Sequence, residues 1–248
     1  MYHISPEKSA DTASERLYAE EQLYIAPGLQ EVSQLSRLVV KEANGCRLTD
    51  MEGRRYLDFM AGVAVCSIGH KHPRYVAALK DQLDKVTVGS FTTENRVRLL
   101  GLIASITPEG LTRTQLYSGG AEAVEAALRL ARSHTGKHEV LSFWGGFHGK
   151  TGGVLGLIGD PFKQNWGTLH PGLHLAPYAD CYRCPFKMKY PDCGIFCLDF
   201  ARKVIENNTA GNLAAIIVET AQGTAGNIFP PPEFLHGLVE IAHERGAL

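Results

Sequence analysis

The sequence predicts an α/β protein built on a mostly parallel sheet, and three observations support this prediction. Short apolar runs typical of strands alternate with amphipathic helical stretches from about residue 112 onward. The run at 213–218 is apolar at every position, as expected of a strand buried on both faces. The composition is that of an ordinary globular protein, with 44% hydrophobic and 21% charged residues among 248.

The first part of the chain is expected to hold an arm and a small antiparallel sheet. Residues 1–25 are polar with a weak helical pattern and precede a break at Ala-Pro-Gly, so they predict an N-terminal arm. Apolar runs separated by turns at Gly45 and Gly53 predict a small antiparallel meander within 38–65. This meander lies in the N-terminal part of a small domain, expected at 26–72.

An incomplete large domain is expected at 73–248. Its helices are predicted from apolar residues three or four positions apart and its strands from short apolar runs. The expected helices are 73–86, 94–106, 121–132, 198–206 and 232–245, and the expected strands are 114–117, 139–143 and 213–218. Glu125 and Arg129, four residues apart, are expected to pair on the exposed face of their helix. Ala247 and Leu248 follow the last helix like the opening of another strand, so the sequence is expected to stop within a βα unit.

Charge and composition exclude several classes of partner. With 25 Lys and Arg against 26 Asp and Glu, the chain has no excess of positive charge for a nucleic acid. No secretory signal opens the sequence and no apolar run approaches the ~20 residues of a membrane span. We therefore expect a cytoplasmic protein that binds neither nucleic acid nor membrane, with most of its cysteines reduced.

A glycine turn opens the helix expected at 121–132. Ser118, Gly119, Gly120 and Ala121 form this turn, and the first free amides of a helix point towards an anion at its N-terminus. Glycines also let a ligand approach the backbone closely. The turn is a candidate phosphate site, although a glycine turn that serves packing alone fits the same residues.

Two further motifs follow predicted strands. Phe147 and His148 lie between glycines after the strand at 139–143, where they could stack on a flat heterocycle. The alternative is a glycine-rich turn with a buried phenylalanine. Glu219 follows the strand at 213–218, and a carboxylate there needs a partner if it is buried; a solvated loop residue is the alternative.

In combination and order, these motifs resemble the class III (omega) aminotransferases. The motifs are Tyr-Leu-Asp-Phe at 56–59, Gly-His-Lys-His-Pro at 69–73, the Ser-Gly-Gly-Ala-Glu turn, Phe-His-Gly-Lys-Thr at 147–151 and Glu-Thr-Ala-Gln-Gly at 219–223. The resemblance runs from about residue 25 to residue 248. It implies the type I pyridoxal-phosphate-dependent transferase fold, with pyridoxal 5'-phosphate as the cofactor.

The resemblance also assigns residues. It implies that Gly120 and Ala121, adjoined by Ser118 and Gly119, bind the cofactor phosphate. By the same resemblance, Phe147 stacks on the pyridine ring with His148 beside it, and Glu219 belongs to the inner active site.

A substrate residue departs from the family pattern. Lys150 stands where many members have an arginine that holds a substrate carboxylate. Lysine offers a point charge in place of a bidentate fork, so the family's substrate preference does not carry over to this chain.

The family reaction moves an amino group from an amine or omega-amino acid to a 2-oxo acid, in homodimers. The family's Schiff-base lysine, and the aspartate that protonates the pyridine nitrogen, have no counterpart among residues 1–248, so no catalytic residue is assigned. The chain alone is expected to be inactive, and a separate C-terminal half could restore the lysine. The alternatives are an amino-acid racemase or lyase on the same scaffold, and a non-catalytic binding partner.

Four cysteines lie close together in the sequence. Cys181, Cys184, Cys193 and Cys197 have C-x-x-C and C-x-x-x-C spacings, and four thiolates could bind zinc or an iron–sulfur cluster. The interpretation that we favour is a cysteine-rich loop with free thiols or a local disulfide, and thus no metal.

Overall fold

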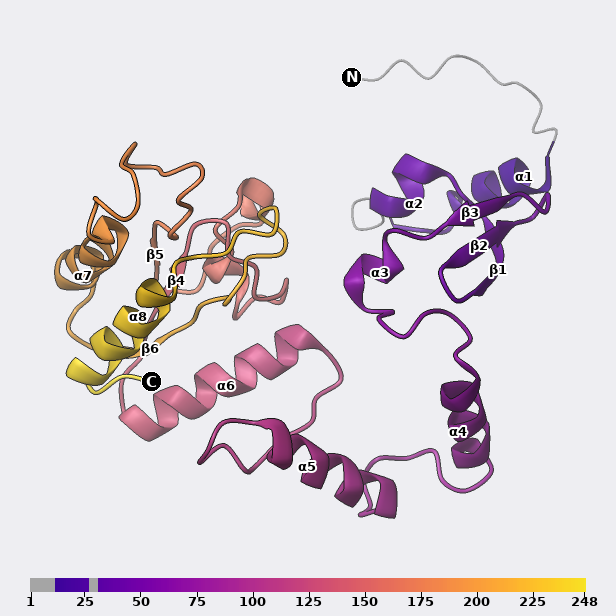
Figure 1. The fold of residues 1–248 in the computed structure, drawn as a ribbon, viewed down its shortest axis with the longest axis horizontal. Coiled ribbons are helices and arrows are strands. Elements are labelled where there is room, and N and C mark those ends of the chain that lie inside the picture. The colour runs from indigo at the N-terminus through magenta and orange to yellow at the C-terminus, as the bar shows by residue number, and fades with distance from the viewer. Residues whose placement is uncertain (1–11, 27–30) are drawn as a thin grey trace. The chain divides into compact units, whose positions relative to one another are not determined.

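The structure is a computed structural model that describes residues 12–26 and 31–248 (Figure 1). The chain folds as two compact units, Met1–Arg98 and Leu99–Leu248, and each unit is described by itself. The domain limits expected at residues 25 and 72 remain predictions, and most of the arm's first half lies outside the described residues.

The first unit contains the expected antiparallel meander. Its elements are α1 (Ala13–Glu21), α2 (Glu31–Ser36), β1 (Val40–Asn44), β2 (Arg47–Asp50), β3 (Arg55–Leu57), α3 (Ala61–Ala64) and α4 (Pro73–Leu83). The strands pair antiparallel in the order β1-β2-β3. Gly45 and Gly53 make the turns with φ of 56° and 83°, the left-handed region that glycine adopts most readily. The meander and both turn residues are confirmed.

Helix α1 begins at a capping box and is joined to the meander. The Thr12 hydroxyl accepts from the amide of Glu15, and the Glu15 carboxylate accepts from the amide of Thr12, which satisfies two of the helix's first donors. The Ser14 amide donates to Glu52 over 2.9 Å. Part of the expected arm is therefore an ordered helix.

The second unit is a parallel sheet with helices on both faces. α5 (Glu94–Ile106) leads into it, followed by α6 (Gly120–Thr135), β4 (Glu139–Phe143), η1 (Leu155–Leu157), η2 (Pro161–Lys163), β5 (Leu173–Ala176), α7 (Phe196–Asn208), β6 (Leu213–Ile216) and α8 (Pro232–Glu244). Strand β4 pairs parallel with both neighbours, in the order β5-β4-β6. The predicted mostly parallel α/β architecture is confirmed.

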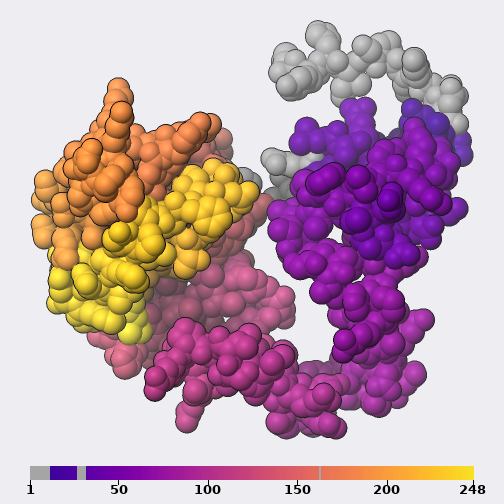
Figure 2. Space-filling model, viewed as in Figure 1, coloured from indigo at the N-terminus to yellow at the C-terminus, as the bar shows by residue number. Residues whose placement is uncertain are grey.

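The sheet separates two apolar clusters. On one face α7 and α8 pack against Leu141 and Phe143, and Figure 2 shows α8, in yellow, against α7, in orange. On the other face Val140 contacts the cluster of α6 and η1. Successive residues of β4 therefore point to opposite faces, which is why this strand is apolar at most positions.

The strand predictions were wrong for residues 114–117 and omitted β5, whereas the strand expected to open at the last residues does pair with the sheet. Residues 114–117 are not a strand: no described strand pairs with them, and Leu116 and Tyr117 are 46% and 43% exposed. Strand β5 is missing from the prediction because its short run is interrupted by His174. At the other edge of the sheet, Leu248 donates to the Ala214 carbonyl over 3.0 Å and accepts from the Ile216 amide over 2.9 Å, which is the parallel strand pairing expected there.

Among the described residues, no helix combines the length and apolarity needed to cross a bilayer.

Candidate functional site

The glycine turn leaves open space at the start of α6. Gly119 precedes the helix in an extended conformation and no side chain caps the helix there. A Cβ added to Gly120 would meet no atom within 4 Å, and one added to Gly119 would meet only the Glu122 carboxylate, at 3.5 Å. The start of α6 therefore has no side-chain cap, and a Cβ at Gly120 would meet no described atom within 4 Å.

The loop after β4 packs directly on this turn. Gly149 has φ of 116°, and a Cβ there would lie 2.5 Å from the Ala121 Cβ and 2.7 Å from its Cα. Only glycine allows such an approach. The structure thus brings together two motifs that lie far apart in the sequence.

Glu125 holds the continuation of the same loop. Its carboxylate accepts from the Thr151 hydroxyl and, over 3.2 Å, from the Gly153 amide. The expected pair with Arg129 is wrong, because no such ion pair occurs in the described part of the chain. Glu125 instead accepts two hydrogen bonds from the neighbouring loop. An exposed ion pair with Arg129 on the same helix would contribute little stability.

Glu219 joins the ends of β4 and β6. One carboxylate oxygen accepts from the Phe147 amide over 2.8 Å and the other from the Gly223 amide over 3.2 Å. The Phe147 side chain is half-buried, and the Lys150 ammonium lies 5.9 Å from its ring centre. The solvated-loop alternative for Glu219 does not describe this geometry, because both oxygens are engaged.

His148 points into the protein. Its Nε2 lies 3.1 Å from the Ser142 hydroxyl, which itself donates to the Leu157 carbonyl over 3.1 Å. The Ser142 hydrogen is therefore used, so Nε2 carries a hydrogen and donates. Burial lowers the pKa of His148, while the nearby Glu219 acts in the opposite direction. His148 is thus a neutral, buried group that holds the loop carrying Phe147 to Ser142 of β4.

The sequence interpretation missed two residues that complete this arrangement. Gln222 is 1% exposed and donates to the Trp144 carbonyl over 2.9 Å. The Tyr178 hydroxyl donates to the Glu219 carbonyl over 2.8 Å, and burial followed by Glu219 raises the pKa of Tyr178 to about 12. Gln222 lies inside the Glu-Thr-Ala-Gln-Gly motif and could have been found there. Tyr178 follows the strand that was not predicted.

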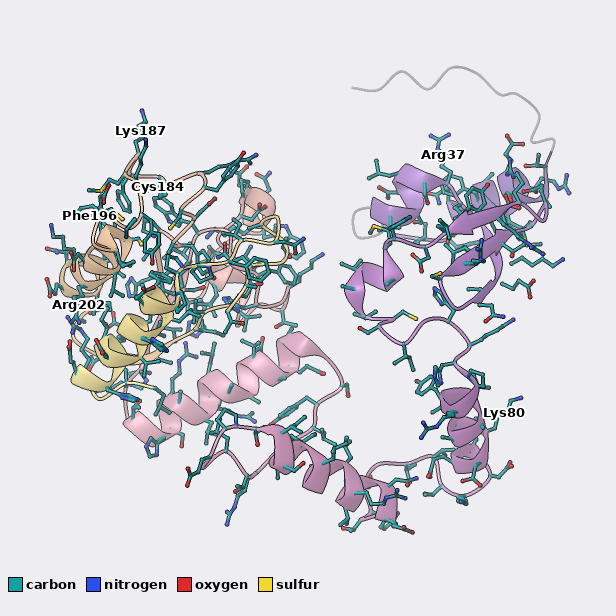
Figure 3. The ribbon with its side chains drawn as sticks, in the orientation of Figure 1. Arg37, Lys80, Cys184, Lys187, Phe196 and Arg202 are labelled. Carbon is teal, nitrogen blue, oxygen red and sulfur yellow. The ribbon has the colours of Figure 1, made fainter. Side chains whose placement is uncertain are left out.

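The four loop cysteines line one cavity together with aromatic side chains. Cys184 and Phe196 lie towards the base of the loop, and Lys187 projects at its tip (Figure 3). No three His, Cys, Asp or Glu side chains among the described residues are placed to hold a metal ion. Burial raises the pKa of Cys181, and that of Cys197 to about 11, so both thiols stay protonated near neutral pH.

Comparison with known proteins identifies the family. The model of the family "Aminotransferase class-III" matches residues 29–248. A diaminobutyrate–2-oxoglutarate aminotransferase of Haemophilus influenzae is 32% identical over 100% of this chain and 56% of its own length. A leucine/methionine racemase of Thermococcus litoralis is 30% identical over 85% of this chain and 49% of its own length. The chain spans about half the length of the curated relatives it matches.

A solved structure supports the same conclusion. An amine transaminase from an uncultivated Pseudomonas species, in its PLP-bound form, superimposes with a TM-score of 0.78 at 29% identity, over 91% of this chain and 53% of that one. The fold is that of the type I pyridoxal-phosphate-dependent transferases, and class III members use pyridoxal phosphate. By family match, relatives and fold together, this chain belongs to the class III aminotransferases.

Proposed function

We propose that this chain forms the phosphate-binding and ring-stacking part of a pyridoxal-phosphate-dependent aminotransferase that moves an amino group from an amine or omega-amino acid to a 2-oxo acid. The contact between Gly149 and Ala121 carries the proposal. It holds the loop that carries Phe147 against the start of α6, and a flat phosphorylated ring requires an aromatic side chain near such a helix start.

The residues present fit pyridoxal phosphate. The amides of Gly120 and Ala121 offer donors to a dianionic phosphate at the positive end of α6, with Ser118 and Gly119 adjoining. Among the described residues, no atom lies within 4 Å of a Cβ added to Gly120. We assign Phe147 to one face of the pyridine ring.

When bound, pyridoxal phosphate supplies an electron sink for negative charge on the carbon next to the amino nitrogen. The chain's own groups position it. Glu219 fixes the Phe147 backbone, Tyr178 fixes the Glu219 backbone, and neutral His148 supports the loop. Exposed Lys150 would offer one positive charge to a substrate carboxylate.

Binding without turnover is the expected behaviour of the chain alone, because its assigned site includes no Schiff-base lysine. A calorimetric titration with pyridoxine 5'-phosphate tests binding, since this analogue has no aldehyde to react with surface lysines. We expect saturable binding that pyridoxine, which lacks the phosphate, does not reproduce. Equal affinity for the two ligands would contradict the phosphate assignment.

A pair of variants localises the site. Gly120→Glu places a carboxylate in the open space before the amides, and we expect affinity to fall by at least about tenfold, the equivalent of roughly 1.4 kcal/mol. Gly152→Glu is the matched control, because a Cβ on Gly152 also meets nothing within 4 Å. Equal losses in both variants would remove the assignment of the glycine turn.

A second candidate function is amino-acid racemisation, which the match to the leucine/methionine racemase favours. Incubating the complete enzyme with a single enantiomer of an amino acid, with and without a 2-oxo acid, separates the two reactions. Loss of optical activity without the 2-oxo acid would support the racemase. The proposal also includes a homodimer and a cytoplasmic location, to be tested by sedimentation of the complete enzyme and by cell fractionation.

A further inference from the structure

The first unit contains a cluster of reactive groups, none of which is among the residues assigned to the cofactor. It consists of Asp58, Cys66 and His70. The His70 backbone is fixed to the turn between β1 and β2, because Gly45 and His70 exchange two backbone hydrogen bonds of 2.9 Å. The imidazole is therefore attached to a well-defined part of the meander.

Asp58 sets the tautomer of His70. One carboxylate oxygen accepts from the amides of Met60 and Ala61 over 2.9 and 2.8 Å. The other lies 2.7 Å from His70 Nε2. Hydrogen bonds from His70, then from the backbone, hold the pKa of Asp58 below its ordinary value. The carboxylate accepts, so Nε2 carries a hydrogen, and in the neutral tautomer the lone pair of His70 is therefore at Nδ1.

That lone pair faces a thiol. Cys66 Sγ lies 3.8 Å from His70 Nδ1, within reach of an S–H donor. The chain returns to this position through α3, where Ala61, Gly62, Val63 and Ala64 all have positive φ, between 46° and 64°. Because three of these four residues carry a Cβ, the turn is strained, a feature that clusters at functional sites.

We propose that Cys66 is a nucleophilic thiol, served by His70 as base and by Asp58 as the positioning residue, that reacts with the disulfide of a low-molecular-mass thiol. The arrangement has the order thiol, imidazole, carboxylate that activates cysteine nucleophiles. Cys66 is half-buried, and its neighbours Val65 and Ile68 are largely exposed, so a small disulfide can reach the sulfur.

The proposed reaction is a thiol–disulfide exchange. The thiol proton moves from Cys66 Sγ to His70 Nδ1, and the thiolate attacks one sulfur of the disulfide. A bond forms between Cys66 and that sulfur while the original S–S bond breaks. The leaving thiolate takes the proton back from Nδ1. Cys66 is oxidised to a mixed disulfide, and half of the small disulfide is reduced to a free thiol.

The chain provides internal comparisons. Cys46 is exposed, and within the described residues its thiol makes no hydrogen bond to a histidine. Cys197 is partly buried among aromatic side chains and stays protonated. Exposure alone would make the exposed Cys46 react faster than Cys66, whereas the proposed base makes Cys66 react faster than Cys46. The two explanations therefore predict opposite orders.

Timed reaction of the full chain with oxidised glutathione tests the proposal. The reaction is quenched with acid, remaining thiols are blocked, and tryptic peptides carrying each cysteine are quantified by mass spectrometry. We expect the mixed disulfide at Cys66 to form about tenfold faster than at Cys46, in line with the activation of histidine-paired thiols. A ratio near or below one in the unmodified chain overturns the proposal without any variant.

Variants distinguish the effect of the His70 base on the Cys66 rate from the effect of the local environment. His70→Gln should reduce the Cys66 rate to that of Cys46, and Asp58→Asn should reduce it partly. His72→Gln, two positions away, is the matched control and should leave it unchanged. The Cys46 rate in the same samples serves as the internal reference for reagent reactivity, and the amide hydrogen exchange of β1–β3 monitors folding. An unchanged Cys66 rate in His70→Gln, with a normal Cys46 rate, would also overturn the proposal.

Discussion

Each of the two units of this chain is stabilised internally by a different kind of interaction. In the second unit, Leu141, Phe143, Phe234 and Ile241 are fully buried in one apolar cluster. In the described part of the first unit, residues 12–26 and 31–98, the fully or nearly fully buried side chains are Ser14 and Asp50, and Phe59 is 91% exposed.

The difference shows that directional hydrogen bonds can determine a structure, as apolar burial does. Asp50 accepts from the amides of Glu52 and Arg54 and from the side chains of Arg54 and Tyr56. Such bonds fix geometry, yet each contributes little net stability. Apolar burial fixes geometry less sharply but contributes more for each residue. We therefore expect the first unit to open more easily than the second.

The largest expected effect comes from removing a central ring of the apolar cluster. Phe234 packs edge-on against Phe143 and Tyr178, with centroids 5.5 Å apart in both pairs. Phe234→Ala should destabilise the second unit by about 3–5 kcal/mol, measured as lost hydrogen-exchange protection in β4 and β6. Phe229→Ala, at a side chain 73% exposed, is the control. Equal losses in β1–β3 would erase the distinction between the units.

Acid should open the first unit before the second. Burial alone would raise the pKa of Asp50, but hydrogen bonds from Arg54 and Tyr56 outweigh it and lower the pKa. The Ser14 hydroxyl lowers the pKa of Glu52, and His70 lowers that of Asp58. The unfolded state then binds more protons below the ordinary values of 3.8 and 4.5, so stability falls as the pH drops through that range.

Amide resonances of β1–β3 and of β4–β6, followed by NMR from pH 6 to pH 2.5, measure this difference. We expect the first set to lose its dispersion at a higher pH than the second, although Glu139 also has a lowered pKa in the second unit. Simultaneous loss of both sets would show that the polar network does not limit the first unit.

Asp50→Asn should reproduce part of the acid effect at neutral pH. The new amide group would set a donor against the Arg54 and Tyr56 donors that Asp50 now accepts. We expect opening of the meander to become about tenfold more frequent, as for the loss of one charge-assisted hydrogen bond. Glu42→Gln removes only an exposed pair with Lys71 and should change little. Hydrogen exchange of β2 amides measures both.

The sequence predicted the elements whose pattern is local. Helix α5 and strand β4 have the predicted limits, 94–106 and 139–143, because apolar spacing and breakers such as Pro108 determine them. Strand β5 and residues 114–117 were mistaken, because pairing with a neighbour decides whether a short apolar run is a strand.

The site residues remain predictions, and the contacts among them could not be predicted from the sequence. The sequence places Phe147 and Glu219 each after a predicted strand. The fit of Gly149 against Ala121, and the choice of Glu125 for a loop hydroxyl over Arg129, depend on distances between segments. The pattern of residues within one segment does not predict distances between segments.

The smallest expected effect concerns a polar bond inside the apolar unit. Ser142→Ala removes the hydroxyl that donates to the Leu157 carbonyl and accepts from His148. Two buried groups lose a partner, but His148 is 8% exposed and can turn towards water, so we expect a loss of about 1 kcal/mol. Thermal unfolding measures it, with Ser133→Ala, at an exposed position of α6, as the control. A loss as large as that of Phe234→Ala would mean that directional bonds also govern the second unit, and the contrast between the units would then concern only their amount of buried surface.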